Sequence, residues 1–587
     1  MKKLINSPET VVAEMCKGIE ISNPEVEFLE KYKILKKREI NQDKVTLISG
    51  GGSGHEPAHG GYVGTGMLDA AVCGDVFASP SQIQVYQGIK AAAGKKGTLL
   101  IIKNYSGDIM NFTNGAAMAV EEGFPVEYVK VEDDIAVTDS LYTVGRRGVA
   151  GTVFVHKIAG AAAQKGLELS EVKRLAQKAA DSVRSIGAGY SSCTVPAAGT
   201  PTFSIEEDEM EYGVGIHGEP GRNREKAASA KALAQRMTQE LLEDLKVEKE
   251  QEIAVLVNGF GATPLQELYI MAYQVFRELS QKGIKVYRTF TGNYMTSIDM
   301  QGCSVSFLRL DEELKEYLDL PAESPGFRVD GPVISPVYTP LKTEKAEENN
   351  GEFICANEWR QVKNDVLTLE NIGAMVACMG NCILRNEVNF CKLDSHAGDG
   401  DFGSSIAKGF RKVQGEWTEI LETEFSSVKE FLMACSMIIM EHCGGASGPV
   451  WGSAFRAAAL QAGEKRELTL LEFAGIMQAA VEGIQRTGER SFGRGAVPGD
   501  KTLIDALVPC AEQLRKAAEE NQKIKEALMQ GAAAAVKGAE ETKNLVARMG
   551  RAGTVGKRSL GYPDAGAYAL GVIFTEISDF LLTDSKN

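Results

Sequence analysis

Residues 49–61 read SGGGSGHEPAHGG, a glycine-rich run that contains an H-E-x-x-H pattern from His55 to His59. On a helix, two histidines at this spacing bind zinc and the glutamate serves as the base. The residues before His55 are mostly glycine, which disfavours a helix, and Pro57 is best tolerated in a first helical turn. His55 would then lie outside any helix, so the pattern does not favour a zinc site.

The run directly follows the β-branched stretch VTLIS at 45–49. A strand that leads into a glycine-rich turn and a helix start aims free backbone amides at an oxygen-rich ligand. No G-K-[ST] follows, so the run is not a P-loop, and its glycine spacing does not match a dinucleotide fingerprint. We therefore expect a ligand-binding loop and a helix that begins near Pro57.

Short β-branched runs alternate with helical patterns from about residue 40 to 335. An amphipathic stretch at 224–245 is one of the intervening helical patterns. This alternation predicts an α/β domain with mainly parallel sheets and with ligands at the carboxyl ends of strands. The expected strands are 45–49, 70–74, 98–103, 126–131, 212–217, 253–259 and 285–290.

A change in composition divides the chain into two domains. Residues 336–356 are rich in Pro, Lys, Glu and Asn, which is typical of a linker. Helical periodicity dominates residues 357–587, in roughly eight segments, which predicts an all-α bundle or barrel. We expect residues 1–335 to form the α/β domain.

The overall composition limits the functions that this chain can have. Its 587 residues carry a formal net charge of −15, which argues against nucleic acid or an anionic membrane as a partner. Eleven cysteines without a C-x-x-C pair are typical of reduced thiols. The N-terminus has no apolar signal region, and the longest apolar run, FLMACSMIIM, is too short to span a membrane. We expect a cytoplasmic protein.

Polar residues follow several of the expected strands. Lys103 and Asp108 lie in IIKNYSGD, after one strand, and His217 lies between glycines in GVGIHGEPG. A lone histidine is usually a hydrogen-bonded core residue, but one surrounded by glycines has little core to join. Because parallel strands end at one edge of a sheet, we expect these side chains and His55 to form one ligand site.

A second group of polar residues lies in the helical half. The stretch LDSHAGDGDFGSS contains Asp394, Asp399 and Asp401, with glycines that let the chain bend toward one point. An EF-hand is excluded because its sixth position would be Asp399 and its twelfth Ser405. Three carboxylates that face a triphosphate bring together about seven negative charges, which predicts about two Mg²⁺ ions.

Three further glycine-interrupted stretches resemble loops at helix ends. GGASGP at 444–449 offers backbone amides and Ser447 to phosphate oxygens, and we expect a helix to start there. PGDKTLIDAL at 498–507 and RAGTVGKRSLGYPDAGA at 551–567 are the other two.

Taken together, these motifs resemble those of the dihydroxyacetone kinase family. The stretches SGGGSGHEPAHGGYVG, CGDVFASPS, KNYSGD and GIHGEPG resemble the family's substrate-binding domain over most of residues 10–335. GDGD, GGASG and PGDKT resemble its nucleotide-binding domain over about 357–587. The resemblance implies an ATP-dependent kinase, with two α/β subdomains followed by an eight-helix barrel that binds ATP through Mg²⁺.

The same resemblance implies roles for individual residues of the sugar site. His217 would add a ring nitrogen to the ketone and form a hemiaminal, with assistance from His55. Asp108 would accept the proton of the attacking hydroxyl. The residues implied to bind the sugar are Gly52, Ser53, Gly54, His55, Lys103 and Asp108.

For the nucleotide site the resemblance implies that Asp394, Asp399 and Asp401 hold Mg²⁺. Two departures from the family pattern, the bulky Phe402 and PDAGA in place of PDPGA, concern the fit of the nucleotide. Residues implied to surround the nucleotide are Phe402, Gly403, Ser404, Ala446, Ser447, Lys501, Arg551, Asp564 and Gly566.

Family members form homodimers in which the nucleotide domain of one subunit serves the sugar site of the other, and we expect the same here. Three alternatives stay open. The substrate could be erythrulose or glyceraldehyde, the protein could be a ketose-sensing co-activator without catalysis, or it could have a manganese-dependent flavin-nucleotide cyclase side activity.

Overall fold

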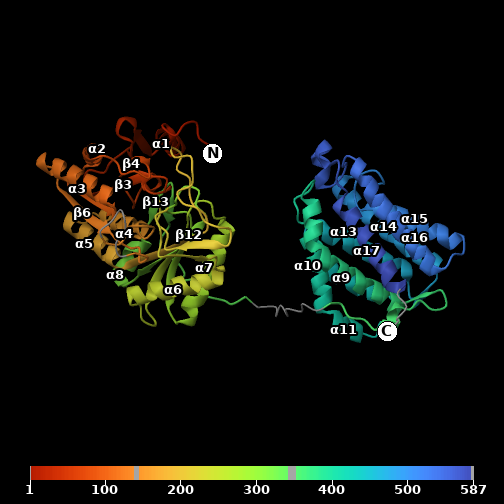
Figure 1. Cartoon of the computed structure of the whole chain (residues 1–587). Coiled ribbons are helices and arrows are strands. Elements are labelled where there is room, and N and C mark those ends of the chain that lie inside the picture. Colours follow the sequence, from red (N-terminus) through yellow and green to blue (C-terminus); the bar gives the residue numbers. More distant parts are fainter. Residues whose placement is uncertain (1, 138–144, 342–351, 583–587) are drawn as a thin grey trace. The chain divides into compact units, whose positions relative to one another are not determined.

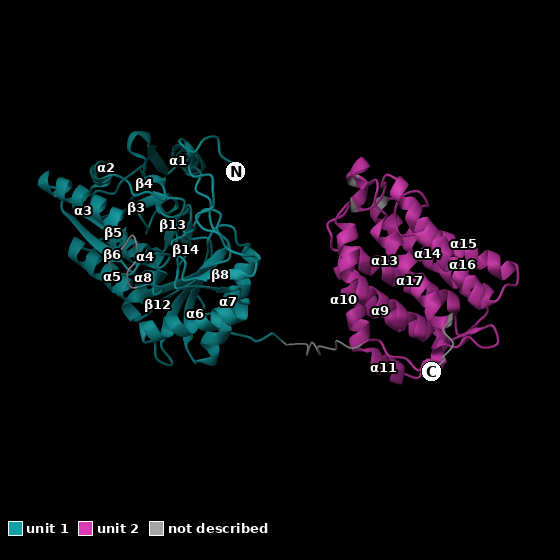
Figure 2. Ribbon diagram, viewed as in Figure 1, with its two compact units in different colours: residues 1–342 teal, residues 343–587 magenta. Residues whose placement is uncertain are grey.

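The computed structural model describes residues 2–137, 145–341 and 352–582. The chain divides into two compact units, residues 1–342 and 343–587 (Figure 2). Each unit has its own hydrophobic core. The division places the α/β part in the first unit and the helical part in the second (Figure 1).

The first sheet of unit 1 has six strands in the order β1-β2-β4-β3-β5-β6. Its four strands β4, β3, β5 and β6 are parallel to their neighbours, as predicted, and β1 and β2 join antiparallel at one edge. The bounds are β1 (Val26–Leu29), β2 (Ile34–Lys37), β3 (Thr46–Ser53), β4 (Ala70–Val76), β5 (Thr98–Lys103) and β6 (Val126–Val131).

The glycine run forms part of strand β3 rather than a turn before a helix. Gly50 and Gly51 pair in parallel with Val72 and Cys73 of β4. A Cβ on Gly50 would lie 2.2 Å from the carbonyl oxygen of Val72, so a side chain there would prevent the strands from approaching. The expected helix near Pro57 is wrong, since the described chain makes only a short 3-10 turn, η2 (Gly60–Tyr62), at this point.

The second sheet has the order β11-β10-β12-β7-β8-β9 and is mainly antiparallel, which corrects the prediction of parallel sheets. Only β10 and β11, which the helix α7 connects, run parallel. Only Tyr212 of the expected strand at 212–217 lies in a strand, where it is the last residue of β8. Gly213 has a φ of +80° and turns the chain at this point. The bounds are β7 (Val183–Gly189), β8 (Glu209–Tyr212), β9 (Asn223–Lys226), β10 (Glu252–Gly259), β11 (Lys285–Gly292) and β12 (Gly302–Arg309).

Helices cover both sheets of unit 1. Helices α2 and α3 pack on one face of the first sheet, α4 and α5 share a core with residues of both sheets, and α6 and α7 pack on the second. A capping box between Ser81 and Gln84 starts α2. The bounds are α1 (Val11–Ser22), α2 (Gln82–Ala92), α3 (Ser106–Glu121), α4 (Thr152–Gln164), α5 (Leu169–Asp181), α6 (Ala230–Leu245), α7 (Leu265–Gln281) and α8 (Glu312–Asp319). Two short strands, β13 (Ala322–Ser324) and β14 (Phe327–Val329), form a hairpin.

Helices make up nearly all of unit 2, as predicted. In the order α9, α10, α12, α13, α14, α15, α16, α17, each helix packs on the next, and α17 packs on α9. Capping boxes start α9 at Thr368 and α14 at Thr469. The bounds are α9 (Leu369–Asp394), α10 (Phe402–Gly415), α11 (Trp417–Glu422), α12 (Val428–His442), α13 (Ser447–Ala462), α14 (Leu470–Phe492), α15 (Ile504–Glu519), α16 (Ile524–Glu541) and α17 (Ala565–Leu582).

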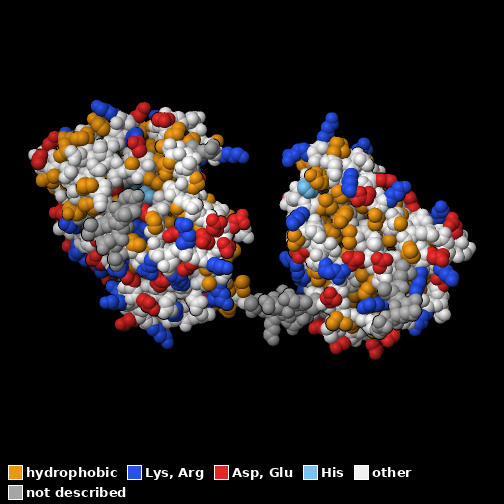
Figure 3. Space-filling view, viewed as in Figure 1, with side chains coloured by type: hydrophobic (Ala, Val, Ile, Leu, Met, Phe, Trp, Pro, Cys, Tyr) orange, Lys and Arg blue, Asp and Glu red, His pale blue; other side chains and the backbone are white. Residues whose placement is uncertain are grey.

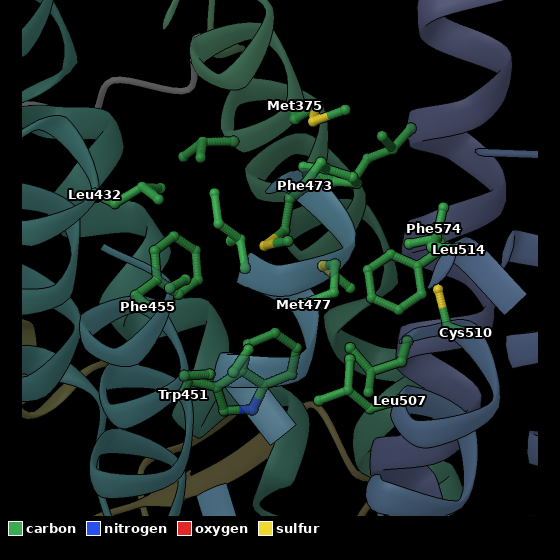
Figure 4. Close-up of a pocket in the computed structure, with 18 of the residues that line it drawn as sticks. Met375, Leu432, Trp451, Phe455, Phe473, Met477, Leu507, Cys510, Leu514 and Phe574 are labelled. Atoms are coloured by element: carbon green, nitrogen blue, oxygen red, sulfur yellow. The ribbon is translucent and has the colours of Figure 1, made fainter. Parts of the chain in front are cut away.

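These helices line an apolar pocket of about 150 Å³. Figure 4 shows Met375, Phe455 and Phe574, from three different helices, around this space. All of its lining residues are hydrophobic, which matches the nearly all-round apolar pattern of α17.

The cysteines are free thiols in the structure. All eleven cysteines lie in the described part of the chain and none forms a disulfide. Among the described helices, none combines the length and the apolar character needed to cross a membrane. Acidic and basic side chains are interspersed on the face of each unit that Figure 3 shows.

Candidate active site

Two histidines from distant parts of unit 1 meet at the candidate sugar site. The Nε2 atoms of His55 and His217 lie 3.1 Å apart. His55 follows strand β3, and His217 lies in the loop after β8. The prediction that these two residues come together is in agreement with this geometry, although His217 lies in a loop and not at the end of a strand.

The protein fixes the ring of His55 on both sides. Its Nδ1 faces the carbonyl oxygen of Thr296 at 2.8 Å, and a carbonyl only accepts, so Nδ1 carries the proton. Phe77 stacks on the ring with centroids 5.1 Å apart. Burial lowers the pKa of His55 well below its ordinary value, and the charges of His217 and Lys103 act in the same direction. Nε2 of His55 therefore faces His217, and the surroundings of the ring favour its neutral form.

An ion pair lies beside the histidines. The Nζ of Lys103, at the end of β5, is 3.4 Å from Oδ2 of Asp108 in the first turn of α3. Both side chains are almost fully buried, and the hydroxyl of Ser79 donates to Oδ1 of Asp108 at 2.5 Å. The ring of Tyr105 contacts both His217 and Lys103, which joins this pair to the histidines.

The glycine run forms the wall next to this pair. A Cβ on Gly51 would lie 2.9 Å from Nζ of Lys103 and 3.2 Å from Oδ2 of Asp108. Gly52 lies against the backbone of Phe77 and Ala78. The backbone of β3 can therefore approach the ion pair only because these positions have no side chain.

Two other residues of the run have structural partners. The hydroxyl of Ser53 donates to the carbonyl of Gly74 at 2.8 Å. The amide of Gly54 donates to both carboxylate oxygens of Glu56, at 3.0 and 3.1 Å, and Gly54 has a φ of +103°. These bonds hold the chain in the conformation that presents His55.

The H-E-x-x-H pattern does not form a metal site in the described part of the chain. Nδ1 of His59 lies 3.0 Å from Nε2 of His156, and His55 pairs with His217 instead. Neither His55 nor His59 belongs to a cluster of three potential ligands among the described residues. As argued from the glycines and Pro57, His55 lies outside the described helices.

Three residues of the site were not singled out from the sequence. Glu219 accepts a hydrogen bond from Nδ1 of His217 at 2.7 Å, Ser79 contacts Asp108, and Tyr105 contacts His217. Burial alone would raise the pKa of Glu219, but His217 and Arg147 outweigh it and lower this pKa to about 2. All three residues lie in the motifs GIHGEPG, CGDVFASPS and KNYSGD, so the motifs indicated the segments that form the site. The individual contacts could not be predicted, because they exist only in the folded chain.

In unit 2, the three aspartates converge as predicted. One carboxylate oxygen each of Asp394, Asp399 and Asp401 lies within 4.8 Å of the others. Oδ2 of Asp394, at the end of α9, accepts a bond from the amide of Gly400 at 2.9 Å, and Gly400 has a φ of +78°. A Cβ on Gly398 would lie 2.3 Å from Asp394 Oδ1, so the glycines are needed for this bend. Three clustered carboxylates are a donor set that fits Mg²⁺.

The start of α10 adjoins a second predicted loop. Ser405 donates to the carbonyl of Gly444 at 2.6 Å, so the aspartate loop and the 444–447 loop are neighbours. Ala446 is the N-cap residue of α13 and Ser447 is its first residue, which confirms the expected helix start. The first turn of α13, whose backbone amides have no partner within the helix, therefore lies near the aspartate loop.

Residues 402–404 have different surroundings. The ring of Phe402 packs on the core near Phe390, with centroids 6.1 Å apart, so its bulk is directed into the core. A Cβ on Gly403 would lie 2.1 Å from the carbonyl of Glu387, so this glycine allows α9 and α10 to approach. The amide of Ser404 faces the thiol of Cys391.

Hydrogen bonds and ring stacking connect the remaining loops. Nζ of Lys501 donates to the carbonyls of Leu545, Ser559 and Tyr562, so this ammonium ties the 498–507 loop to the segment before α17. Tyr562 in turn stacks on His396, next to the aspartates, with centroids 3.7 Å apart. Lys501 thus acts as a structural connection in this conformation.

Asp564 and Gly566 lie at the start of α17. Asp564 accepts from the amide of Ala567 at 2.8 Å, and burial, with a contribution from Asp505, raises the pKa of Asp564 to about 7. Gly566 packs against Leu503, where a Cβ would lie 3.0 Å from the Leu503 Cβ. The side chain of Arg551 lies outside the described residues.

Comparison with known families agrees with this pair of sites. The family model described as Dak1 domain matches residues 17–326, and the one described as DAK2 domain matches residues 396–579. An α/β unit with a histidine–lysine–aspartate cluster, followed by a helical unit with three clustered aspartates, defines a two-domain phosphotransferase class. The chain belongs to the dihydroxyacetone kinase family, in its single-chain form.

Individual relatives cover one or both units. A dihydroxyacetone-binding subunit DhaK of a PTS-dependent dihydroxyacetone kinase from Listeria innocua is 48% identical over 55% of this chain and 99% of its own length. A putative 3,4-dihydroxy-2-butanone kinase from Solanum lycopersicum is 35% identical, over 97% of this chain and 96% of its own. The crystal structure of the C. freundii dihydroxyacetone kinase in complex with AMP-PNP and Mg²⁺ has 30% identity and a TM-score of 0.59, and covers 98% of this chain and 99% of that one.

Proposed function

We propose that the protein phosphorylates dihydroxyacetone with ATP and Mg²⁺ to give dihydroxyacetone phosphate, with the ketone held as a hemiaminal on His217. The observation that carries this proposal is the contact of His217 with His55 beside the buried Lys103–Asp108 pair. The names of the relatives, two of which refer to dihydroxyacetone, support the same substrate class.

The capture step follows from the arrangement of the two rings. Both Nδ1 atoms donate to oxygens, so the 3.1 Å contact between the Nε2 atoms holds one proton. When this proton rests on His55, the Nε2 lone pair of His217 attacks the carbonyl carbon. The carbonyl π electrons move to the oxygen, which takes the proton from His55. Glycerol has no carbonyl and is excluded by this chemistry.

The phosphate acceptor is a terminal hydroxyl of the captured ketose. Asp108 accepts the hydroxyl proton as the oxygen attacks the γ-phosphorus and ADP leaves with the bridging oxygen, and Lys103 holds the sugar oxygens through charge-assisted hydrogen bonds. Ser79 and Lys103 fix the carboxylate of Asp108 from two sides. The backbone at Gly52, Ser53 and Gly54 forms the wall of the sugar site.

The nucleotide is bound by unit 2 in this proposal. Asp394, Asp399 and Asp401 would hold two Mg²⁺ ions, which neutralise the charge of the phosphates when bound. The amides that start α10 and α13, at Gly403 and Ser447, donate to phosphate oxygens. The proposed remaining contacts are Phe402 and Ser404 through their backbone, and Ala446, Lys501, Arg551, Asp564 and Gly566 around the nucleoside.

We extend the proposal to the arrangement of the helices and of the subunits. Helix α17 packs on α9 at the end of the series of neighbours, which supports a closed eight-helix barrel. Phosphate transfer requires the two sites to meet, and we propose that they meet in a homodimer, with the nucleotide domain of one subunit serving the sugar site of the other. Residues 1–335 and 357–587 are the two proposed domains.

A coupled assay tests the proposal. The purified chain with ATP and Mg²⁺ should consume ATP when dihydroxyacetone is added and should leave glycerol unchanged. ATP consumption without any ketose dependence would contradict the proposal.

A second candidate is the same reaction on a four-carbon ketose, which the name of the tomato relative supports. Steady-state kcat/KM values for dihydroxyacetone, erythrulose, 3,4-dihydroxy-2-butanone and glyceraldehyde decide between them. Binding of a ketose without any ATP consumption would instead identify a ketose sensor.

A further inference from the structure

The carboxylate of Glu219 accepts two hydrogen bonds from the same histidine. Oε1 lies 2.7 Å from Nδ1 of His217, and Oε2 lies 2.9 Å from the backbone amide of His217. We infer that Glu219 is a positioning residue, which decides which ring nitrogen of His217 is free to bond the ketone. This inference rests on the proposed function, because it concerns the same nucleophile.

The surroundings keep this carboxylate in place and ionised. Glu219 is only 5% exposed, and its backbone carbonyl accepts a hydrogen bond from the amide of Gly215, in a turn that brings its side chain next to the ring. A Cβ on Gly215 would lie 1.9 Å from Oε2 of Glu219 and 2.7 Å from Nη1 of Arg147. Arg147 is fully buried, and its Nη1 has no hydrogen-bond partner among the described residues. Its charge therefore favours the ionised form of Glu219.

An ionised carboxylate can only accept, so Nδ1 of His217 keeps its proton. The proton of the 3.1 Å contact lies between the two Nε2 atoms, and when it rests on His55 the free lone pair of His217 is on Nε2. The rings of Phe77 and Tyr105 both stand nearly perpendicular to the His217 ring, at 5.0 and 4.8 Å between centroids. These contacts and the Glu219 bonds together leave the ring one orientation.

The carboxylate also balances the charge that capture creates. Formation of the Nε2–carbon bond uses the Nε2 lone pair, and the ring becomes a cation that still carries the Nδ1 proton. His55 becomes neutral when it gives its proton to the ketone oxygen. The positive charge therefore moves from the histidine pair to the substituted ring of His217, which remains bonded to Glu219.

A change of Glu219 to Gln would reverse the tautomer. Glutamine has one acceptor oxygen, and the backbone amide of His217 requires it because that amide always donates. The NH₂ group of the glutamine then faces Nδ1 and donates to it, so the ring proton moves to Nε2. That Nε2–H would donate to the free Nε2 of His55, which further stabilises the unreactive tautomer.

The test compares E219Q with a matched control, Glu211→Gln. Glu211 is also buried and also accepts a backbone amide, that of Gly221, but it binds Arg224 and does not contact His217. Nitrogen-15 NMR of the histidines without substrate reports the tautomer of His217, and steady-state kinetics with ATP and dihydroxyacetone report kcat and KM. We expect E219Q to show the Nε2–H tautomer and a loss of about 10³-fold in kcat/KM, mainly through KM, as expected for a catalytic imidazole in the wrong tautomer. E211Q should keep the wild-type tautomer and kinetics.

Two outcomes would overturn the inference. One is an E219Q protein that keeps the Nδ1–H tautomer, and the other is a reversed tautomer with unchanged KM. If E219Q does not fold, Glu219→Asp carries the test, because its shorter carboxylate cannot reach both N–H groups. An aspartate variant with a wild-type tautomer population and KM contradicts the inference. The NMR experiment needs no substrate, so it tests the role of Glu219 independently of the kinase reaction. A wild-type chain that phosphorylates no ketose would overturn the proposed function but not the tautomer result.

Discussion

The two candidate sites hold their polar groups in opposite ways. In unit 1, His55 and Lys103 are fully buried and Asp108 is 2% exposed, and each has protein partners. In unit 2, Asp399 and Asp401 are exposed on a loop between α9 and α10. A short ketose offers little surface to bind, so a site for one must be rigid before the substrate arrives. A metal–triphosphate complex supplies its own charge and can complete an exposed site.

The largest effect should come from removal of the proposed nucleophile in the buried site. His217→Ala deletes the covalent tether, so KM for dihydroxyacetone should rise more than kcat falls, with a total loss in kcat/KM of about 10³-fold or more. Steady-state kinetics with ATP in excess measure both constants. An unchanged KM would contradict the tether.

Charge removal in the exposed site should affect turnover and not capture. Asp401→Asn takes one carboxylate from the cluster, and kcat should fall by about 10²–10³-fold, as for loss of one group that stabilises transition-state charge. NMR of labelled dihydroxyacetone should still show the hemiaminal. Glu467→Gln, an exposed carboxylate on β16 (Glu467–Leu468), is the control and should leave kcat unchanged. If D401N also abolished capture, the two sites would not be separable.

A side chain added where β3 approaches the Lys103–Asp108 ion pair should cause an intermediate loss of activity. Gly51→Ala places a Cβ 2.9 Å from Nζ of Lys103, at a φ of +146°, and should displace the Lys103–Asp108 pair. A displacement of about 1 Å in a catalytic group lowers kcat/KM by roughly 10²-fold. Gly123→Ala is the matched control, because Gly123 also has a positive φ, +91°, but no atom within 4 Å of its Cβ position. Equal activities of the two variants would show that only backbone strain matters.

The buried histidines predict that the stability of unit 1 depends on pH. Burial, with a contribution from Lys103, lowers the pKa of His156 to about 3, and its unfolded value is about 6.5. The unfolded chain therefore binds a proton that the folded chain does not, so stability is lost as the pH falls from about 6.5 toward 3. Each such histidine contributes a slope of up to about 1.4 kcal/mol per pH unit. Urea unfolding at pH 7 and pH 5 measures this, and equal midpoints for unit 1 would contradict it.

The sequence allowed a large part of this account to be predicted. The two-part division, the four parallel strands of the first sheet and the convergence of Asp394, Asp399 and Asp401 follow from hydrophobic periodicity and motif spacing. Local patterns carry these features, since a strand, a helix start and a glycine-bent loop are each formed by neighbouring residues.

Features that depend on distant contacts could not be predicted in the same way. The antiparallel pairing of β12 with β7 and β10 depends on strand order, which the alternation of elements does not give. The glycines at 50–52 indicated a turn, but the pairing with β4 keeps them in a strand. Glu219 lies only two residues from His217, yet its role depends on a loop geometry that Gly213 and Gly218 set through positive φ angles.

One measurement tests the central claim most directly: NMR of dihydroxyacetone labelled with carbon-13 at its carbonyl, bound to chain labelled with nitrogen-15 at histidine. The account predicts that the carbonyl signal is replaced by a tetrahedral carbon coupled to a ring nitrogen of His217, and that Mg²⁺–ATP then converts it to the phosphorylated ketose. A carbonyl signal that persists in the bound state, or an adduct that Mg²⁺–ATP leaves unchanged, would contradict it.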